Sequence, residues 1–421
     1  MSDRILERIF KIIQNLKFPT DNNTTSIGNE NALPIVWILE QLYSESLIDF
    51  SLATSAFTSH RRMTILSKKY ISAILLTVGL TSLSSCAKDS GVSAPIAQAH
   101  TIAQRLVSTA VAQKPNNPQF GQPIDCTLGK DCFVLLYFDR EPGPTAVDFG
   151  CGRQTYDGHD GTDFAIPDAK AMAKGVPVIA SAAGKVLRVR DGVVDRRLQN
   201  DTDKASIAGT ECGNGMVIDH GAGWEAQYCH LRKGSVAVKP GTQVQKGTVL
   251  GMVGNSGNAS FPHVHVTFRY QGKPVDPFVG PDAKLGCNIA RNPIWDKPMD
   301  YISTGLIRAG FANKPPDMNA VWEGQFSETK LPANSPALLF WVQSYGVLKG
   351  DREQYKLFAP NGTAIADQTN EIKAPSRTWL GYVGKRNSTN SPLTPGVWRA
   401  EYRLTRGDRV LAQVKREVEL R

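Results

Sequence analysis

The chain has 421 residues, enough for two or three domains, and its 41% hydrophobic and 21% charged residues are typical of a globular protein. The formal net charge of +9 is moderately basic and favours attraction to an anionic surface such as a cell wall. The sequence contains no dense run of Lys and Arg with interleaved aromatic residues, which argues against a nucleic-acid partner.

A secretory leader is predicted from an internal methionine onward. Met63 is followed by Lys68 and Lys69, which form a basic n-region, and then by an apolar run over residues 71–83. The run is too short for a comfortable membrane span, because a membrane helix needs about 20 residues. It closes with Leu-Ser-Ser before Cys86, which resembles a bacterial lipobox, in which the cysteine is lipidated and becomes the mature N-terminus.

This leader divides the start of the chain into three expected segments. Residues 1–62 are expected to be a gene-start extension, and residues 63–86 a lipoprotein signal peptide. Ala87 follows the cysteine, and the absence of Asp there favours the periplasmic face of the outer membrane. Residues 87–122 are rich in Ala, Ser, Gln, Asn and Pro, which predicts a tether to a folded domain.

The rest of the chain is predicted to be mainly β. In residues 123–300, short β-branched and aromatic runs alternate with glycine-rich turns, which indicates β-strands and hairpins. In residues 301–421, strand candidates separated by regular turns predict a small immunoglobulin-like β-sandwich, an accessory domain. Its residues Trp341 and Trp379 could bind glycan, although core packing is the stronger expectation.

Seven cysteines are present, and the six that follow the leader form an even set that suits disulfides in an oxidising compartment. The hairpin signal Gly-Ala-Gly at residues 221–223 brings the two cysteines that flank it near each other. Spacing alone leaves the connectivity open. The candidate pairs are Cys212–Cys229, Cys126–Cys132 and, by elimination, Cys151–Cys287.

A strand predicted over residues 261–268 carries two histidines. His263 and His265 are two positions apart, so on a strand they project from the same face. His159 and Asp163 lie earlier, on a glycine-rich loop and at the start of the strand that follows it, where they can converge on one ion. One of the two strand histidines would complete a His, His, Asp set, and an open three-ligand zinc site of this kind is catalytic because a water takes the fourth position.

His230 supplies a further imidazole at the end of another predicted strand. Alternation along that strand is expected to place Cys229 on the opposite face, so that the cysteine does not join the site. His230 and the strand histidine that does not bind the ion would then lie beside the water. One can take its proton, and the other can stabilise the oxyanion or protonate the leaving amine of a peptide.

The ordered motifs resemble those of the lysostaphin/LytM-type zinc endopeptidases, peptidase family M23. That family's pattern is His-x-x-x-Asp, then Tyr-x-His-Leu, then His-x-His, and all three occur here in this order. The resemblance implies that His159, Asp163 and His265 bind Zn²⁺. It also implies that His230 and His263 are the catalytic histidines.

The resemblance covers roughly residues 145–278 and implies an M23-type antiparallel β-sheet catalytic domain. Its implied activity is hydrolysis of peptide bonds in peptidoglycan stems or cross-links by a zinc-activated water. His220 falls outside the family pattern and is expected to be structural. The stretch from Asp195 to Cys212 departs from the short core pattern, and it is expected to shade the groove and restrict the substrate.

Two other functions stay open at this point. Some members of the family have lost their ligands, so one alternative is a non-enzymatic cell-wall scaffold or amidase activator. The other is a binding module whose β-sandwich holds glycan while the peptidase trims. The expected partners are peptidoglycan, the membrane through a lipid anchor at Cys86, and a further cell-envelope protein.

Overall fold

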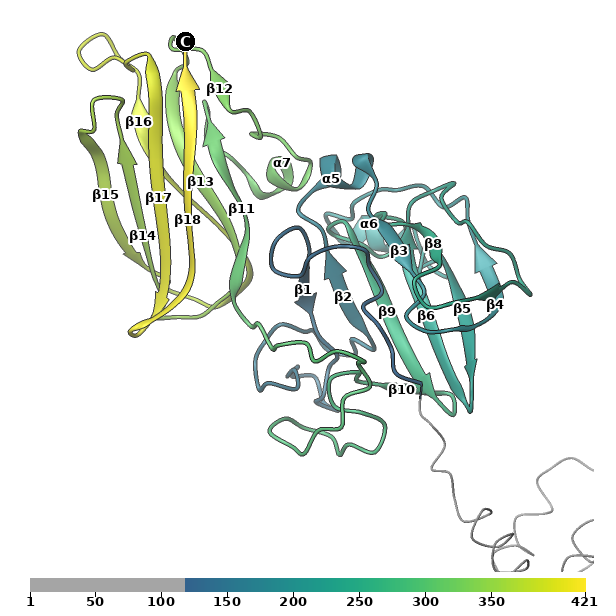
Figure 1. The fold of residues 1–421 in the computed structure, drawn as a ribbon. Coiled ribbons are helices and arrows are strands. Elements are labelled where there is room, and N and C mark those ends of the chain that lie inside the picture. Colours follow the sequence, from purple (N-terminus) through teal and green to yellow (C-terminus); the bar gives the residue numbers. More distant parts are fainter. Residues whose placement is uncertain (1–117) are drawn as a thin grey trace, which may run out of the picture. The chain divides into compact units, whose positions relative to one another are not determined.

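The computed structural model describes residues 118–421. The expected extension, the signal peptide with Cys86 and most of the tether lie outside these residues. Within the described part of the chain, no helix is long and apolar enough to cross a bilayer. The predicted fold class is confirmed: the chain is mainly β, with an antiparallel sheet followed by a second β region (Figure 1).

The first sheet has eight strands and contains the residues of the predicted site. Their order in space is β1-β2-β9-β6-β5-β4-β7, with β10 paired to β9, and all the pairings are antiparallel. A separate pair, β3 (Pro177–Ile179) and β8 (Val249–Met252), lies beside it. The eight strands are β1 (Phe133–Leu136), β2 (Thr162–Ala165), β4 (Gly184–Arg190), β5 (Asn214–Gly221), β6 (Trp224–Leu231), β7 (Gln243–Val244), β9 (His263–Tyr270) and β10 (Lys273–Val275).

Strand β9 shows how the sheet separates its core from its site. Val264, Val266 and Phe268 alternate along one face and are fully buried in the hydrophobic core. Because side chains alternate between the faces of a strand, His263 and His265 project from the other face. The alternation in this strand therefore places apolar residues on the face that packs in the core and two histidines on the opposite face.

Three short helices complete the described fold. They are α5 (Ala169–Lys174), α6 (Asp201–Ala205) and α7 (Met318–Trp322). The side chains of Asp168 and Asp317 cap α5 and α7 by accepting a backbone N–H of the first turn, as Asn200 does for α6. These caps explain why such short helices begin where they do.

The second β region is a sandwich of two sheets that share one hydrophobic core. The three-stranded sheet has the order β11-β13-β16, and the five-stranded sheet has the order β12-β18-β17-β14-β15. Trp341 is fully buried, so core packing is its role and the alternative of glycan binding is wrong for this residue. The strands are β11 (Gly305–Ala312), β12 (Lys330–Leu331), β13 (Ala337–Val347), β14 (Arg352–Phe358), β15 (Ala364–Glu371), β16 (Ser376–Arg386), β17 (Gly396–Arg406) and β18 (Arg409–Leu420).

Contacts join the sandwich to the first sheet. A buried ion pair connects Arg308 of β11 to Asp168, the cap of α5, with 2.6 Å between Nη1 and Oδ2. Phe261 stacks on Trp322 of α7, with 5.5 Å between the ring centroids. These two rings belong to one apolar cluster that also contains Leu136. The cluster explains why the sandwich can contribute residues next to the site.

The start of the packed region differs from the expected boundary. Phe120 falls in the stretch predicted to be tether, yet it is fully buried and its ring lies 4.7 Å from that of Phe268. Its backbone also bridges to Trp295. The folded part therefore begins before residue 123, because a single apolar residue after the proline-rich stretch completes the core.

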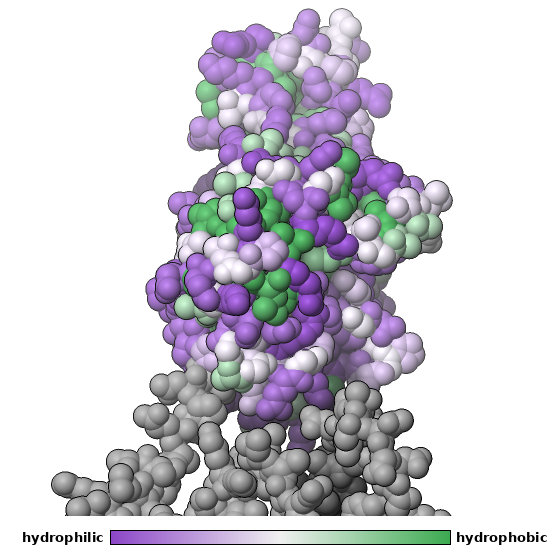
Figure 2. Space-filling view, turned by 90° about the vertical axis from the view of Figure 1, so that its right-hand side faces the viewer, coloured by the Kyte–Doolittle hydropathy of each residue, from purple (hydrophilic) through white to green (hydrophobic). Residues whose placement is uncertain are grey.

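On the face shown in Figure 2, apolar residues on the surface are interrupted by hydrophilic ones. The large apolar side chains that are exposed in the described residues include Leu187, Val194 and Val249. Apolar atoms are common on protein surfaces. These residues need no functional explanation.

Candidate functional site

Adjacent strands bring the predicted site residues together. In the antiparallel pair β2–β9, Asp163 lies directly opposite His265, and Ala165 lies opposite His263. Residues that face each other across two strands project from the same side of the sheet. His159 precedes β2, and its imidazole reaches the same point.

His159, Asp163 and His265 form a compact set of three ligand atoms. Nε2 of His159 lies 3.1 Å from Oδ1 of Asp163 and 3.1 Å from Nδ1 of His265. The same Nδ1 lies 2.8 Å from Oδ1 of Asp163. In a tetrahedral zinc site with bonds of about 2.0–2.1 Å, ligand atoms lie about 3.3 Å apart. The three side chains therefore fit a metal ion of this size, and all are buried.

Hydrogen bonds on the far side of each imidazole fix which nitrogen faces the ion. Nδ1 of His159 donates to the carbonyl oxygen of Tyr137 at 2.6 Å, which leaves Nε2 with its lone pair. Nε2 of His265 lies 2.9 Å from Oγ1 of Thr267 and 3.4 Å from Oδ1 of Asp160, so Nδ1 is left for the ion. Such outer partners orient metal ligands and raise their basicity. The sequence motif alone does not reveal that the carbonyl of Tyr137 and the side chain of Thr267 are the partners of these two imidazoles.

The charges of this cluster favour a cation. Burial alone would raise the pKa of Asp163, but the adjacent His263 and His159 hold that pKa well below its ordinary value. Burial would lower the pKa of His265, whereas hydrogen bonds to Asp160 and Asp163 raise it to about 9. A positive charge is thus stabilised where the ligand atoms meet, and a metal ion would supply it in place of a proton.

His230 reaches the site through an unusual backbone conformation. Cys229 lies opposite His265 in the β6–β9 pair, so the cysteine shares the face of the site. The expectation that Cys229 lies on the other face is therefore wrong. Regular alternation would send His230 into the core, but its φ of 65° breaks the alternation and brings its ring to 4.6 Å from that of His263. A positive φ is uncommon outside glycine and is costly.

His230 and His263 present the same nitrogen to the groove. Nδ1 of His230 donates to the carbonyl of Ser256 at 2.7 Å, and Nδ1 of His263 donates to the carbonyl of Phe261 at 2.8 Å. Burial, then the neighbouring His263 and His265, lowers the pKa of His230 well below its ordinary value. Burial also lowers the pKa of His263. Both rings are therefore neutral near pH 7, with a lone pair on Nε2 that can accept a proton.

The sequence profile of peptidase family M23 matches residues 157–277, which contain all five of these residues. This stretch is therefore similar to a peptidase family M23 domain. Within it, the His-x-x-x-Asp motif and the final His-x-His motif supply the three ligand atoms that converge in the structure. The family likeness and the geometry agree on the same part of the chain.

Curated relatives match a little over a quarter of the chain. The peptidoglycan DD-endopeptidase ShyA of Vibrio cholerae is 33% identical over 118 residues, which are 28% of this chain and 22% of the relative. The DD-carboxypeptidase/endopeptidase Mpg of Neisseria meningitidis is 36% identical over 119 residues, with the same two shares. The chain thus spans about one fifth of the length of the curated relatives that it matches.

Solved structures also align with part of the chain. A zinc-containing peptidase from Vibrio cholerae aligns with 37% of this chain and 36% of its own, at 25% identity and a TM-score of 0.23. The catalytic domain of lysostaphin from Staphylococcus simulans aligns with 33% of this chain and 86% of its own, at 21% identity and a TM-score of 0.22.

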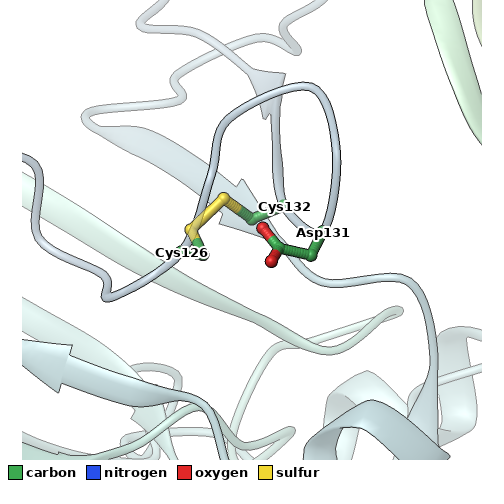
Figure 3. Close-up of side chains that lie close together, drawn as sticks. All are labelled: Cys126, Asp131 and Cys132. Carbon is green, nitrogen blue, oxygen red and sulfur yellow. A yellow bond between two sulfur atoms is a disulfide. The ribbon is translucent and has the colours of Figure 1, made fainter.

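Two other groups of potential ligands lie outside the M23 site. Nδ1 of His220 donates to the carbonyl of Ala183 at 2.8 Å, and the ring packs edge-on against Phe120, so the environment of His220 is structural. Cys126, Asp131 and Cys132 lie close together, but Figure 3 shows the two sulfurs joined in a disulfide. An oxidised cysteine has no thiolate for a metal. Neither group is a second metal site.

The structure contains the three disulfides that the sequence analysis favoured. Cys212–Cys229 is the one next to the site. The backbone N–H of His230 also donates to the carbonyl of Cys212 at 2.8 Å. The disulfide and this hydrogen bond hold the end of β6, where His230 has its positive φ. In the sequence, this disulfide was indicated by the two cysteines that flank the predicted hairpin.

Replacing Cys212 and Cys229 by Ser is expected to lower both stability and turnover. A disulfide that closes a loop of this size contributes about 3 kcal/mol to the free energy of unfolding. Misplacement of His230 is expected to lower kcat by up to about 100-fold. Chemical denaturation, peptide hydrolysis and metal content measure the three effects, and metal content should not change.

The matched control replaces Cys126 and Cys132 by Ser, because this pair closes a shorter loop away from His230. It should lower stability and leave kcat near that of the unchanged protein. Equal losses of kcat in both double variants would show that the Cys212–Cys229 disulfide has no special role in positioning His230.

Proposed function

We propose that the protein is a zinc metalloendopeptidase that hydrolyses peptide bonds in peptidoglycan stems or cross-links. The observation that carries this proposal is the complete set of functional groups that gathers around β9: three converging ligand atoms and two neutral imidazoles beside them. The relative ShyA is named as a peptidoglycan DD-endopeptidase and Mpg as a DD-carboxypeptidase/endopeptidase, which supports the substrate class.

In this proposal, His159, Asp163 and His265 hold Zn²⁺. The donor set of two nitrogens and one carboxylate oxygen suits zinc and leaves a position open. When bound, zinc would polarise the scissile carbonyl and lower the pKa of a water. His265 keeps its ligand nitrogen available because its other nitrogen is held by Thr267.

The two remaining histidines would move the protons. His230 can accept a proton at Nε2 because its Nδ1–H is already donated to Ser256. His263 has the same arrangement with Phe261 and lies next to it, so it can donate a hydrogen bond to the oxyanion or a proton to the leaving amine once it is protonated. A buried pair of neutral imidazoles suits this exchange because each has a free lone pair on Nε2 that can accept a proton from the reacting groups.

We also propose that the protein works in the bacterial cell envelope. The sequence features around Cys86 support a lipid anchor, with the peptidase held by residues 87–122 on the periplasmic face of the outer membrane. The net charge of +9 supports attraction to the anionic wall. Mass spectrometry of the mature N-terminus tests the anchor: a chain that keeps residues before Cys86 would contradict it.

The purified protein is expected to release soluble fragments from purified sacculi in a zymogram. A chelator should abolish the release, and added Zn²⁺ should restore it, because the proposed reaction depends on the ion. A zinc-loaded protein that releases nothing alone but increases the activity of an added amidase would support the activator alternative instead. The intact ligand set argues against that alternative.

A further inference from the structure

The M23 site opens into a groove that other parts of the chain help to form. The groove has a volume of about 810 Å³ and is lined by His230, His263 and His265. It is also lined by residues of the 195–212 stretch and by residues of the sandwich. The expectation that the insertion borders the groove is therefore met, while the contribution of the sandwich was not foreseen.

Contacts between these two walls fix the groove. Nε of Arg197 pairs with Oε1 of Glu323 at 3.2 Å, just after α7. Nδ2 of Asn319 in α7 donates to Oε1 of Gln199 at 3.2 Å. The insertion and α7 thus meet beside the catalytic histidines. A substrate must pass residues that the M23 motifs do not include.

Basic residues outnumber acidic ones in the lining of the groove. Arg197, Lys204 and Arg377 line it, and among its described lining residues the only acidic one is Asp163, which belongs to the metal site. Nη2 of Arg197 is buried and has no hydrogen-bond acceptor in the described residues. A buried donor without an acceptor calls for an explanation, such as a ligand that supplies one. The charges of the lining favour an anionic ligand.

Arg377 is the basic residue best placed to meet that ligand. It lies at the start of β16, and its carbonyl accepts a hydrogen bond from the buried Nε2 of Gln154 at 3.5 Å. The same Nε2 donates to the carbonyl of Leu135 at 2.9 Å, which ties β16 to β1. The backbone of Arg377 is therefore held while its side chain is exposed, and within residues 118–421 it has no acidic partner.

Arg377 lines the same groove as Asp163 and His265, two of the proposed zinc ligands. Tyr156 also lines this groove and lies against His159, with 4.6 Å between the ring centroids. The groove thus contains both Arg377 and the proposed metal site.

We infer that Arg377 binds a free carboxylate of the substrate peptide, so that the enzyme selects peptides with a negative charge near the scissile bond. This inference rests on the proposed function and names a specificity-determining residue that comes from the sandwich. Arginine suits the role because its planar guanidinium donates two parallel hydrogen bonds to a carboxylate. Arg377 positions the peptide and takes no part in proton transfer.

The kinetic test compares two substrates. One is a cross-linked muropeptide dimer with its free carboxylates, and the other is the same dimer after chemical conversion of those carboxylates to carboxamides. The zinc-loaded protein is expected to cleave the first with a kcat/KM about tenfold higher, mainly through KM, which corresponds to about 1.4 kcal/mol. Arg377→Gln should abolish the difference, and Arg377→Lys should keep part of it.

Arg386→Gln is the matched control, because Arg386 is exposed on the same strand and does not line the groove. It should leave the preference unchanged. A preference that survives Arg377→Gln, or that Arg386→Gln removes equally, would overturn the inference. Cleavage of both dimers at equal rates by the unchanged protein would also overturn it while leaving the proposed peptidase function intact.

A binding measurement tests the role of Arg377 without requiring catalysis. Calorimetric titration of the metal-free protein with both dimers excludes capture of the carboxylate by the ion. The carboxylate dimer is expected to bind about tenfold more tightly, and Arg377→Gln should bind both equally. Equal binding by the unchanged metal-free protein would contradict the inference. If the zinc-loaded protein cleaves neither dimer, the proposed function fails, and this titration still tests Arg377.

Discussion

His265→Ala is expected to lose the metal and, with it, all hydrolysis. In the proposed site His265 supplies one of the three ligand atoms, and its Nδ1 lies 2.8 Å from the carboxylate of Asp163. Loss of an outer partner of a ligand alone costs about 10–100-fold in metal affinity, so loss of the ligand itself should cost more than about 100-fold. Elemental analysis of the protein after dialysis, together with hydrolysis of sacculi, measures both effects.

Two controls make this result specific. Thr267→Val removes only the partner of Nε2, so metal affinity should fall by about 10–100-fold while the protein with added Zn²⁺ stays active. His220→Ala removes an imidazole of the same sheet outside the site, so metal content should stay unchanged. A His265→Ala protein that retains a full equivalent of zinc would contradict the assignment of this ligand.

His230→Ala is expected to keep the metal and lose turnover. Removing a general acid or base typically lowers kcat by about 10²–10⁴-fold. The three ligand atoms do not include His230, so zinc content should match that of the unchanged protein. The measurements are zinc content and kcat on a cross-linked muropeptide substrate.

The backbone at this position calls for a second variant. His230 has a φ of 65°, and Asn adopts this conformation more readily than Ala does. His230→Asn should therefore retain the local backbone and still lack the proton-accepting imidazole. If either variant hydrolysed peptides at the unchanged rate, the proton-transfer role of His230 would be wrong. If both lost zinc, His230 would be a ligand.

The fold class could be predicted from local alternation, whereas the choice of metal ligands depended on the resemblance of the ordered motifs to a known family. Alternation in β9 places His263 and His265 on one face, and antiparallel pairing then puts Asp163 opposite His265. The cysteine pairs were recoverable for a related reason, because a hairpin brings Cys212 and Cys229 together.

Other parts of the site could not be predicted because no local pattern encodes them. The positive φ of His230 occurs at a residue type that gives no hint of it, and it reverses the face that alternation predicts. The partners of the imidazoles at Tyr137 and Ser256 are backbone carbonyls, which every residue has. Arg377 enters the groove through packing between distant segments, so its place near the ligands depends on the tertiary fold.

Mass spectrometry of the muropeptides released from defined cross-linked peptidoglycan tests the central claim most directly. The zinc-loaded protein is predicted to convert cross-linked dimers into monomers by adding one water for each peptide bond cut, and a chelator should prevent the conversion. Dimers that stay intact, or products cut only between glycan and peptide, would contradict the account.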